Sequence, residues 1–303
     1  MTRVIFMGTP DYAESILEAL ITADDIEVVA VYTQPDKPVG RKAVLTPPVV
    51  KVLAEKANIP VKQPTRLRDE EVVTDLRSIP CDLIIVAAYG QILPKAVLEH
   101  APCINLHASI LPQYRGASPI QQSLLNNDSQ SGVTAMWMDE GLDTGAIIKI
   151  ETLEIGADEM VESLYKRLTD SAVRLTLDVI RHWDRRSAIK QNDAEATYCK
   201  KILKSDGLID FSDACEIYNR YRAFTPWPGI FTESGLKIKE MRLEDESSSG
   251  EAGVISRIDK EGVVVQCKKG SLKITRVQAP SKQETSVVDY LNGKRIGCGY
   301  PLV

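Results

Sequence analysis

Asn105 and His107 could act together on a carbonyl group. They are two positions apart in the apolar run 103–107, which predicts a strand, so both side chains should project from the same face. An Asn amide donates hydrogen bonds through a fixed planar group, and an imidazole donates or accepts a proton near neutral pH. Open α/β sheets bind ligands at the carboxyl ends of their strands. There, such a pair could hold and protonate a carbonyl oxygen.

Asp143 is the third residue of this candidate site. It lies in the sequence EGLDTG at 140–145, where glycines on both sides allow a tight turn that carries a carboxylate into a cleft. A carboxylate beside an imidazole favours the charged form of the ring. We therefore interpret Asn105, His107 and Asp143 as a candidate catalytic site. The alternative interpretation is a structural histidine at a strand end and an unrelated turn aspartate.

Motifs of several other chemistries are missing from the sequence. The segment GTPD at 8–11 has one glycine and a proline, so it offers few backbone N–H groups for a pyrophosphate. The sequence has no Walker loop, no H-E-x-x-H and no G-x-S-x-G motif. These absences disfavour redox, phosphoryl-transfer and serine-esterase functions. With three histidines, and six cysteines that form no C-x-x-C pair, we expect no metal and reduced, inert thiols.

Strand and helix patterns alternate around these residues in the first half of the chain. Continuous apolar runs predict strands, and apolar residues at helical spacing predict helices. We expect strands at 3–7, 26–33, 82–88, 103–107 and 133–138, and helices at 13–21, 49–57, 93–99, 118–126 and 160–183. This alternation predicts an α/β domain with a mostly parallel sheet that helices cover on both faces.

The character of the sequence changes near residue 185. The following stretch is polar and without periodicity, which is typical of a linker. Beyond it, one helical pattern precedes four short strand patterns separated by turns rich in Gly, Ser and Asp, which predicts a small antiparallel β-barrel. We therefore expect a first domain at 1–185, a linker at 186–205 and a second domain at 206–303.

Composition and charge agree with a two-domain cytoplasmic protein. The 303 residues are 44% hydrophobic and 26% charged, which excludes wholesale disorder. No apolar run is long enough for a membrane span, and the first residues lack the pattern of a signal peptide. Residues 200–303 hold 17 Lys and Arg against 14 Asp and Glu, whereas residues 1–199 hold 20 against 28. This uneven charge weakly indicates an anionic partner for the second half.

Six segments are similar to motifs of one enzyme family. They are GTPDYA at 8–13, QPDKPVGR at 34–41, VAAYGQILP at 86–94, INLHASILPQYRGASPIQ at 104–121, MDEGLDTG at 138–145 and RAFTPWPG at 222–229. Through these segments the sequence resembles the methionyl-tRNA formyltransferases, a family of folate-dependent formyltransferases. The resemblance implies a Rossmann-like formyl-transfer domain at 1–185 and an OB-like tRNA-binding domain at 206–303. It implies formyl transfer from 10-formyltetrahydrofolate to the α-amino group of methionyl initiator tRNA, for translation initiation.

The resemblance also implies roles for individual residues. Asn105, His107 and Asp143 match the catalytic residues of the family. The residues expected to contact folate are Ser109, Ile110, Leu111 and Pro112, where Ile110 replaces a usual leucine, together with Tyr89 and Gly90. Tyr89 is equally compatible with a buried strand end. The residues expected to contact tRNA are Lys37, Arg41 and Lys42, in the Pro-, Lys- and Gly-rich loop 34–48, and Lys200, Lys268 and Lys269.

Other functions stay open at this point. Formyltransferases that act on aminosugar nucleotides share both halves, although they tend to be fused to another catalytic domain. Glycinamide ribonucleotide formyltransferases share the Asn, His and Asp but usually have a single domain. A non-catalytic tRNA-binding protein would keep the Asn-His pair as a relic and would bind tRNA in a salt-dependent way without turnover. We expect a monomer that needs no membrane partner.

Overall fold

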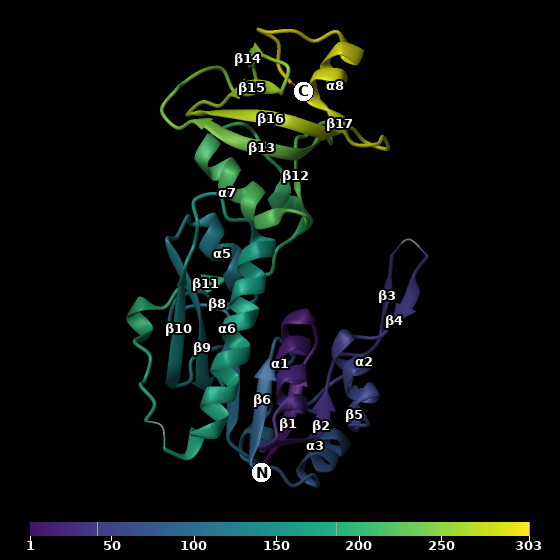
Figure 1. Ribbon diagram of the computed structural model, residues 1–303, viewed down its shortest axis with the longest axis vertical. Helices are drawn as coiled ribbons and strands as arrows, with labels where there is room; N and C mark the ends of the chain where they lie inside the picture. Colours follow the sequence, from purple (N-terminus) through teal and green to yellow (C-terminus); the bar gives the residue numbers. More distant parts are fainter. Residues whose placement is uncertain (41, 186, 303) are drawn as a thin grey trace. The chain divides into compact units, whose positions relative to one another are not determined.

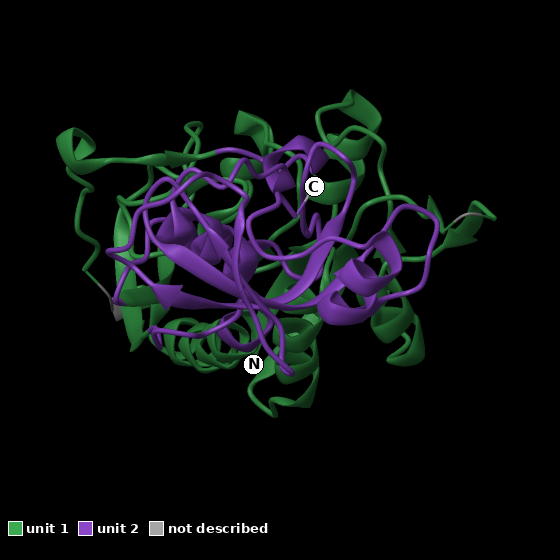
Figure 2. Cartoon of the chain, turned by 90° about the horizontal axis from the view of Figure 1, so that it is seen from above, with its two compact units in different colours: residues 1–119, 130–154, 165–199 green, residues 120–129, 155–164, 200–303 purple. Residues whose placement is uncertain are grey.

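The computed structural model describes residues 1–40, 42–185 and 187–302. The chain divides into two compact units, coloured separately in Figure 2. Unit 1 consists of residues 1–119, 130–154 and 165–199, and unit 2 consists of residues 120–129, 155–164 and 200–303. Within the described part of the chain, no helix is long and apolar enough to cross a membrane.

Unit 1 is built on a seven-stranded sheet with the order β10-β9-β7-β6-β1-β2-β5 (Figure 1). Its strands are β1 (Thr2–Gly8), β2 (Ile26–Tyr32), β5 (Val61–Lys62), β6 (Leu83–Ala87), β7 (Cys103–His107), β9 (Gln130–Trp137) and β10 (Ile147–Glu154). Neighbouring strands from β7 to β5 are parallel, whereas β9 pairs antiparallel with both β7 and β10. This mostly parallel sheet confirms the predicted α/β architecture.

Helices and a buried core support the sheet. The helices of unit 1 are α1 (Asp11–Thr22), α2 (Val49–Lys56), α3 (Glu70–Arg77), α4 (Lys95–Leu98) and most of α6 (Val161–Arg181). Helix α5 (Pro119–Leu125) belongs to unit 2 except for its first residue. Helix α1 packs against β1, β2 and β6. Alternate residues of a strand share one face, and on one face Ile5 and Met7 join Ile84 and Val86 in a single core. Helix α3 was not predicted, although Val72, Val73 and Leu76 stand at helical spacing in its sequence and pack in this core.

Two short pairings in unit 1 lie near predicted functional segments. Inside the loop 34–48, β3 (Lys37–Val39) and β4 (Val44–Thr46) form an antiparallel hairpin that projects from the unit (Figure 1). Strand β11 (Tyr198–Cys199) pairs in parallel with β8 (Arg115–Gly116), which begins three residues after the folate-contact segment 109–112 expected from the sequence. Residues 187–199 are therefore anchored to unit 1, although their sequence has no strand or helix periodicity.

Unit 2 contains an antiparallel sheet with the order β12-β13-β16-β15-β14, and β17 pairs with β16. These strands are β12 (Ile230–Phe231), β13 (Lys237–Asp245), β14 (Ile255–Ile258), β15 (Val263–Gln266), β16 (Ser271–Gln278) and β17 (Thr285–Ser286). Helix α7 (Ala214–Phe224) packs against β12, β13 and β16, and α8 (Val287–Lys294), which was not predicted, packs against β16 and β17. The antiparallel sheet confirms the predicted class of the second domain, and the described strand pairings follow an open path rather than a complete ring. Short 3-10 turns occur at Trp183–Arg185, Asp193–Glu195 and Lys204–Gly207.

Candidate active site

The candidate site lies at the carboxyl end of β7, inside the sheet of unit 1. Strand β7 pairs in parallel with β6 and antiparallel with β9, so neither of its edges is open. Asn105 and His107 are the third and fifth residues of this five-residue strand, so they project from the same face. The His107 side chain is 7% exposed and Asn105 is half-buried. The strand therefore presents an amide and an imidazole side by side, as the sequence predicted.

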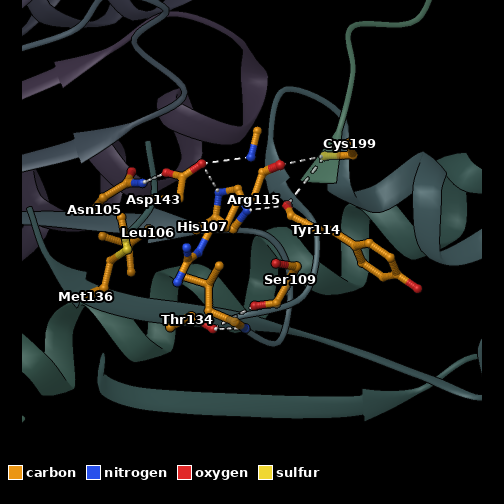
Figure 3. A network of polar contacts seen from close by, with 12 residues as sticks. Asn105, Leu106, His107, Ser109, Tyr114, Arg115, Thr134, Met136, Asp143 and Cys199 are labelled. Atoms are coloured by element: carbon orange, nitrogen blue, oxygen red, sulfur yellow. Dashed lines mark hydrogen bonds and ion pairs between the residues drawn. The ribbon is translucent and has the colours of Figure 1, made fainter. Parts of the chain in front are cut away.

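The structure brings Asp143 to this pair (Figure 3). Asn105 Nδ2 donates a 3.2 Å hydrogen bond to Asp143 Oδ1, and the backbone N–H of Gly116 donates a 2.9 Å hydrogen bond to Oδ2. Oδ2 also lies 3.7 Å from His107 Nδ1, and the Asp143 side chain is 12% exposed. One carboxylate thus contacts three residues between positions 105 and 116, at least 27 residues before it in the sequence.

The turn after β9 sets the position of Asp143. Asp139 Oδ1 accepts hydrogen bonds from the Gly141 N–H (3.0 Å) and from the Thr144 hydroxyl (2.6 Å). Asp143 itself has a φ of 54°, a left-handed conformation that non-glycine residues seldom adopt. A Cβ atom at position 145 would lie 1.7 Å from the Trp137 carbonyl oxygen, so the chain needs Gly145 there. The hydrogen bonds to Asp139 and the close approach at Gly145 therefore stabilise the unfavourable backbone conformation of Asp143.

The His107 ring is oriented from both sides. Its Nε2 atom lies 2.9 Å from the carbonyl oxygen of Tyr114. A carbonyl oxygen only accepts hydrogen bonds, so the hydrogen-bond network assigns a proton to Nε2. Nδ1 then faces the Asp143 carboxylate, and it is the ring atom that can act on a molecule beside this carboxylate.

The predicted folate-contact segment 109–112 begins two residues after His107. The Ser109 hydroxyl donates to the Gln113 carbonyl (2.6 Å), and the Thr134 hydroxyl donates to the Ser109 carbonyl (2.6 Å) while it accepts from the Leu111 N–H (3.1 Å). The Ser109 and Leu111 side chains are buried, whereas Ile110 and Pro112 are half-exposed. Ile110 and Pro112 are therefore the side chains of this segment that can reach a ligand.

Tyr89 and Gly90 follow β6, the parallel neighbour of β7, so they leave the same edge of the sheet as residues 109–112. The Tyr89 side chain is 2% exposed and belongs to the buried core. Its carbonyl accepts hydrogen bonds from Gln34 Nε2 (3.0 Å) and the Thr9 hydroxyl (3.3 Å). Gly90 is exposed and has a φ of 81°. The Tyr89 ring thus has a structural position, and the backbone at Gly90 is the accessible part.

The lysines expected to contact tRNA lie in both units. Lys37 and Lys42 are exposed on the β3–β4 hairpin, whereas Arg41 lies outside the described residues. Lys200 and Lys268 are exposed in unit 2. Lys269 differs from them because its ammonium group forms a 2.8 Å ion pair with Asp213, and this hydrogen bond raises the pKa of Lys269.

Three residues around Asp143 were not identified from the sequence. They are Gly116, which donates to the carboxylate, Arg115, whose side chain is 1% exposed, and Gln191, which is 5% exposed and contacts both Arg115 and the Asp143 turn. Gln191 lies in the predicted linker 186–205 and belongs to no periodic pattern or motif of the sequence. Among the residues that the structure describes, no group of three or more His, Cys, Asp or Glu side chains is arranged to hold a metal ion.

Comparison with known families identifies the chain. Residues 2–180, more than half of its length, match the family described as formyl transferase. The chain belongs to the formyl transferase family. Residues 201–295 match the domain described as formyl transferase, C-terminal domain. The two matches cover most of the sequence and leave residues 181–200 between them.

Full-length relatives and solved structures agree with this assignment. The chain is 57% identical over 294 residues to the methionyl-tRNA formyltransferase of Sulfurimonas denitrificans, which covers 97% of both chains. It is 53% identical over 299 residues to the methionyl-tRNA formyltransferase of Nitratiruptor, which covers 98% of both chains. Among solved structures, the N-formyltransferase of Helicobacter canadensis, in complex with folinic acid and dTDP-3-aminofucose, is similar in fold. Its TM-score is 0.65 at 20% identity, over 90% of this chain and 99% of that chain.

Proposed function

We propose that this formyl transferase moves the formyl group of 10-formyltetrahydrofolate to the α-amino group of methionyl initiator tRNA. The observation that carries the proposal is the contact of the Asp143 carboxylate with Asn105 and its 3.7 Å approach to His107 Nδ1, at a strand end of the sheet. The folate complex of the structural relative supports a folate-derived donor. The relatives of 53% and 57% identity, both methionyl-tRNA formyltransferases, support methionyl-tRNA as the acceptor.

The reaction needs hydrogen-bond donors where negative charge develops. The amine lone pair attacks the formyl carbon, and the electron pair of the C=O bond moves onto the formyl oxygen. Asn105 has a second amide N–H besides the one that it donates to Asp143, and a protonated His107 donates through Nδ1. We place the formyl oxygen within reach of both donors. Removing one such donor costs about 3 kcal/mol in the barrier, roughly a hundredfold in rate.

The reaction also moves a proton from the attacking amine to the folate nitrogen that leaves. The Asp143 carboxylate lies 3.7 Å from His107 Nδ1, and we assign the role of base in this transfer to it. When the tetrahedral carbon collapses, its bond to the folate nitrogen breaks and that nitrogen takes the electron pair and a proton. Asp143 accepts the proton of the amine and returns a proton to the folate nitrogen, so the protein has the same protonation before and after the reaction.

We assign formyl transfer to residues 1–185 and tRNA binding to residues 206–303 and the β3–β4 hairpin. Ile110, Pro112 and the Gly90 backbone are the proposed folate contacts with accessible atoms. Lys37, Lys42, Lys200 and Lys268 are exposed cations that can meet phosphates. A cytoplasmic location and a monomeric state stay predictions.

The direct test supplies the purified protein with 10-formyltetrahydrofolate and two acceptors in parallel, charged initiator tRNA and a dTDP-linked aminosugar. We expect formylmethionyl-tRNA and no formylated sugar, read by mass spectrometry after mild hydrolysis of the ester. Formylation of the sugar alone would replace the proposed acceptor. Tight tRNA binding without any turnover would support the non-catalytic alternative instead.

A further inference from the structure

The Gln191 side chain bridges the Asp143 turn and Arg115. Its Nε2 donates 2.8 Å hydrogen bonds to the carbonyl oxygens of Asp143 and Gly145. Its Oε1 accepts from Nη2 (2.8 Å) and Nε (3.1 Å) of Arg115. An amide has two N–H donors and two acceptor positions, so Gln191 uses its whole hydrogen-bonding capacity in this bridge.

Burial makes the bridge energetically significant. Gln191 is 5% exposed and Arg115 is 1% exposed, so water does not readily replace these hydrogen bonds. A buried polar group that loses its partner retains its full desolvation cost. The guanidinium of Arg115 also donates to the carboxylate of Asp193 (2.8 Å), which supplies its counter-charge two residues after Gln191.

The bridge holds the two backbone segments that position the Asp143 carboxylate, namely the turn of Asp143 and the segment of Arg115 and Gly116. On one side it holds the carbonyl groups on either side of Thr144, and Asp143 there has the unfavourable φ of 54°. On the other side it holds Arg115, whose next residue, Gly116, donates its N–H to Asp143 Oδ2. The segment that carries Gln191 is itself fixed, because Ile189 exchanges two 2.8 Å backbone hydrogen bonds with Ile147.

We propose that Gln191 is a positioning residue for formyl transfer, which sets the approach of the Asp143 carboxylate to His107. This inference rests on the proposed function. Gln191 touches neither substrate nor the reacting atoms, so its loss should slow the chemical step and leave substrate binding nearly intact. With this role, residues 187–199 support the active site in addition to connecting the two domains.

Two substitutions separate the donors of Gln191 from its shape. Gln191→Glu keeps the size and an acceptor for Arg115 but places a carboxylate oxygen against two carbonyl oxygens. Gln191→Met keeps an unbranched side chain of similar length and removes all four hydrogen bonds. We expect kcat to fall at least tenfold in both variants, with KM for folate and for tRNA within about twofold of the wild-type value.

Gln63→Glu is the matched control. Gln63 Nε2 also donates two hydrogen bonds, to the Gln34 carbonyl (2.9 Å) and to Asp36 Oδ1 (2.7 Å), so the same chemical change is made in the same unit. It follows the edge strand β5, four strands along the sheet from β7. We expect a comparable loss of thermal stability in this variant and an unchanged kcat.

A double-mutant cycle tests whether Gln191 acts through Asp143. In an Asp143→Asn background, adding Gln191→Met should lower the residual kcat by less than twofold. If the two losses multiply, Gln191 acts independently of Asp143 and the proposal is wrong. A wild-type kcat in folded Gln191→Met would also overturn it. Absence of turnover in the wild-type protein would instead contradict the proposed function, on which the positioning role depends.

Discussion

The backbone N–H of Gly116 donates a 2.9 Å hydrogen bond to Oδ2 of Asp143, the oxygen that also lies 3.7 Å from the imidazole of His107. Gly116 has a φ of 118°, and a Cβ atom at this position would lie 2.4 Å from the carbonyl oxygen of Cys199. The lack of a side chain therefore lets the segments around Gly116 and Cys199 pair closely. This pairing places the N–H that holds the carboxylate.

Asp143→Asn should lower kcat by at least a hundredfold. Both carboxylate oxygens accept hydrogen bonds, from Asn105 and Gly116, whereas an amide would offer one oxygen and one NH₂ group. The variant also removes the negative charge beside His107. Asp24→Asn is the control, because it makes the same chemical change at an exposed position of unit 1, outside the turn that carries Asp143. Steady-state kinetics with both variants would refute the role of Asp143 if they were equally active.

Asn105→Ala should lower kcat about a hundredfold and change tRNA affinity little, because it removes one donor to the formyl oxygen. Asn105→Asp should be worse, since it places a second carboxylate about 3 Å from Asp143 Oδ1. Single-turnover rates at saturating substrates measure both effects. If the alanine and aspartate variants had the same rate, charge repulsion at this position would play no part.

Lys268→Gln should weaken tRNA binding more than Lys269→Gln. Lys268 is exposed, whereas the Lys269 ammonium group already pairs with Asp213 at 2.8 Å and must give up this partner to bind a phosphate. Each phosphate contact contributes roughly 0.7–0.9 to the slope of log affinity against log salt concentration. Titration of the protein with tRNA at a series of salt concentrations measures the affinity, and this slope should become less steep for Lys268→Gln. An unchanged slope in both variants would remove these lysines from the tRNA contacts.

The cysteines should differ sharply in their reaction with iodoacetamide. Burial raises the pKa of the Cys103 and Cys267 thiols to about 12 and that of Cys81 to about 11, so almost no thiolate is present at pH 7.5. Cys298 is exposed. Peptide mapping should find native protein alkylated first at Cys298, and Cys103 and Cys267 modified only after denaturation. Early alkylation of Cys103 would contradict the burial of this residue at the start of β7.

The sequence predicted the parts of the site that depend on local periodicity. The two-residue spacing of Asn105 and His107 on a strand places them on one face, and the structure has them there. The approach of Asp143 depends on strand order and turn geometry, which spacing alone does not determine. The glycine-flanked turn indicated Asp143 as a candidate partner, and the resemblance to a family implied the same residue.

Gln191 and Arg115 show what sequence patterns do not reveal. Their contacts join positions 76 residues apart in the sequence, and both are polar residues that composition would place at the surface. Residues 187–199 pair with unit 1 through the isolated bridge between Ile189 and Ile147 and through a two-residue strand, which leave no periodic pattern. Such a segment is indistinguishable from a linker until the partners of its backbone are known.

The central claim is that His107 and its neighbours carry out formyl transfer to methionyl-tRNA. The most direct measurement is the single-turnover rate of formylmethionyl-tRNA formation by wild-type protein, His107→Ala and His100→Ala. His100 is the control because its ring also contacts a backbone carbonyl, that of Ile79 at 3.0 Å, in the same unit. We predict a rate at least about a hundredfold lower for His107→Ala and a wild-type rate for His100→Ala. A near wild-type rate for folded His107→Ala would contradict the account.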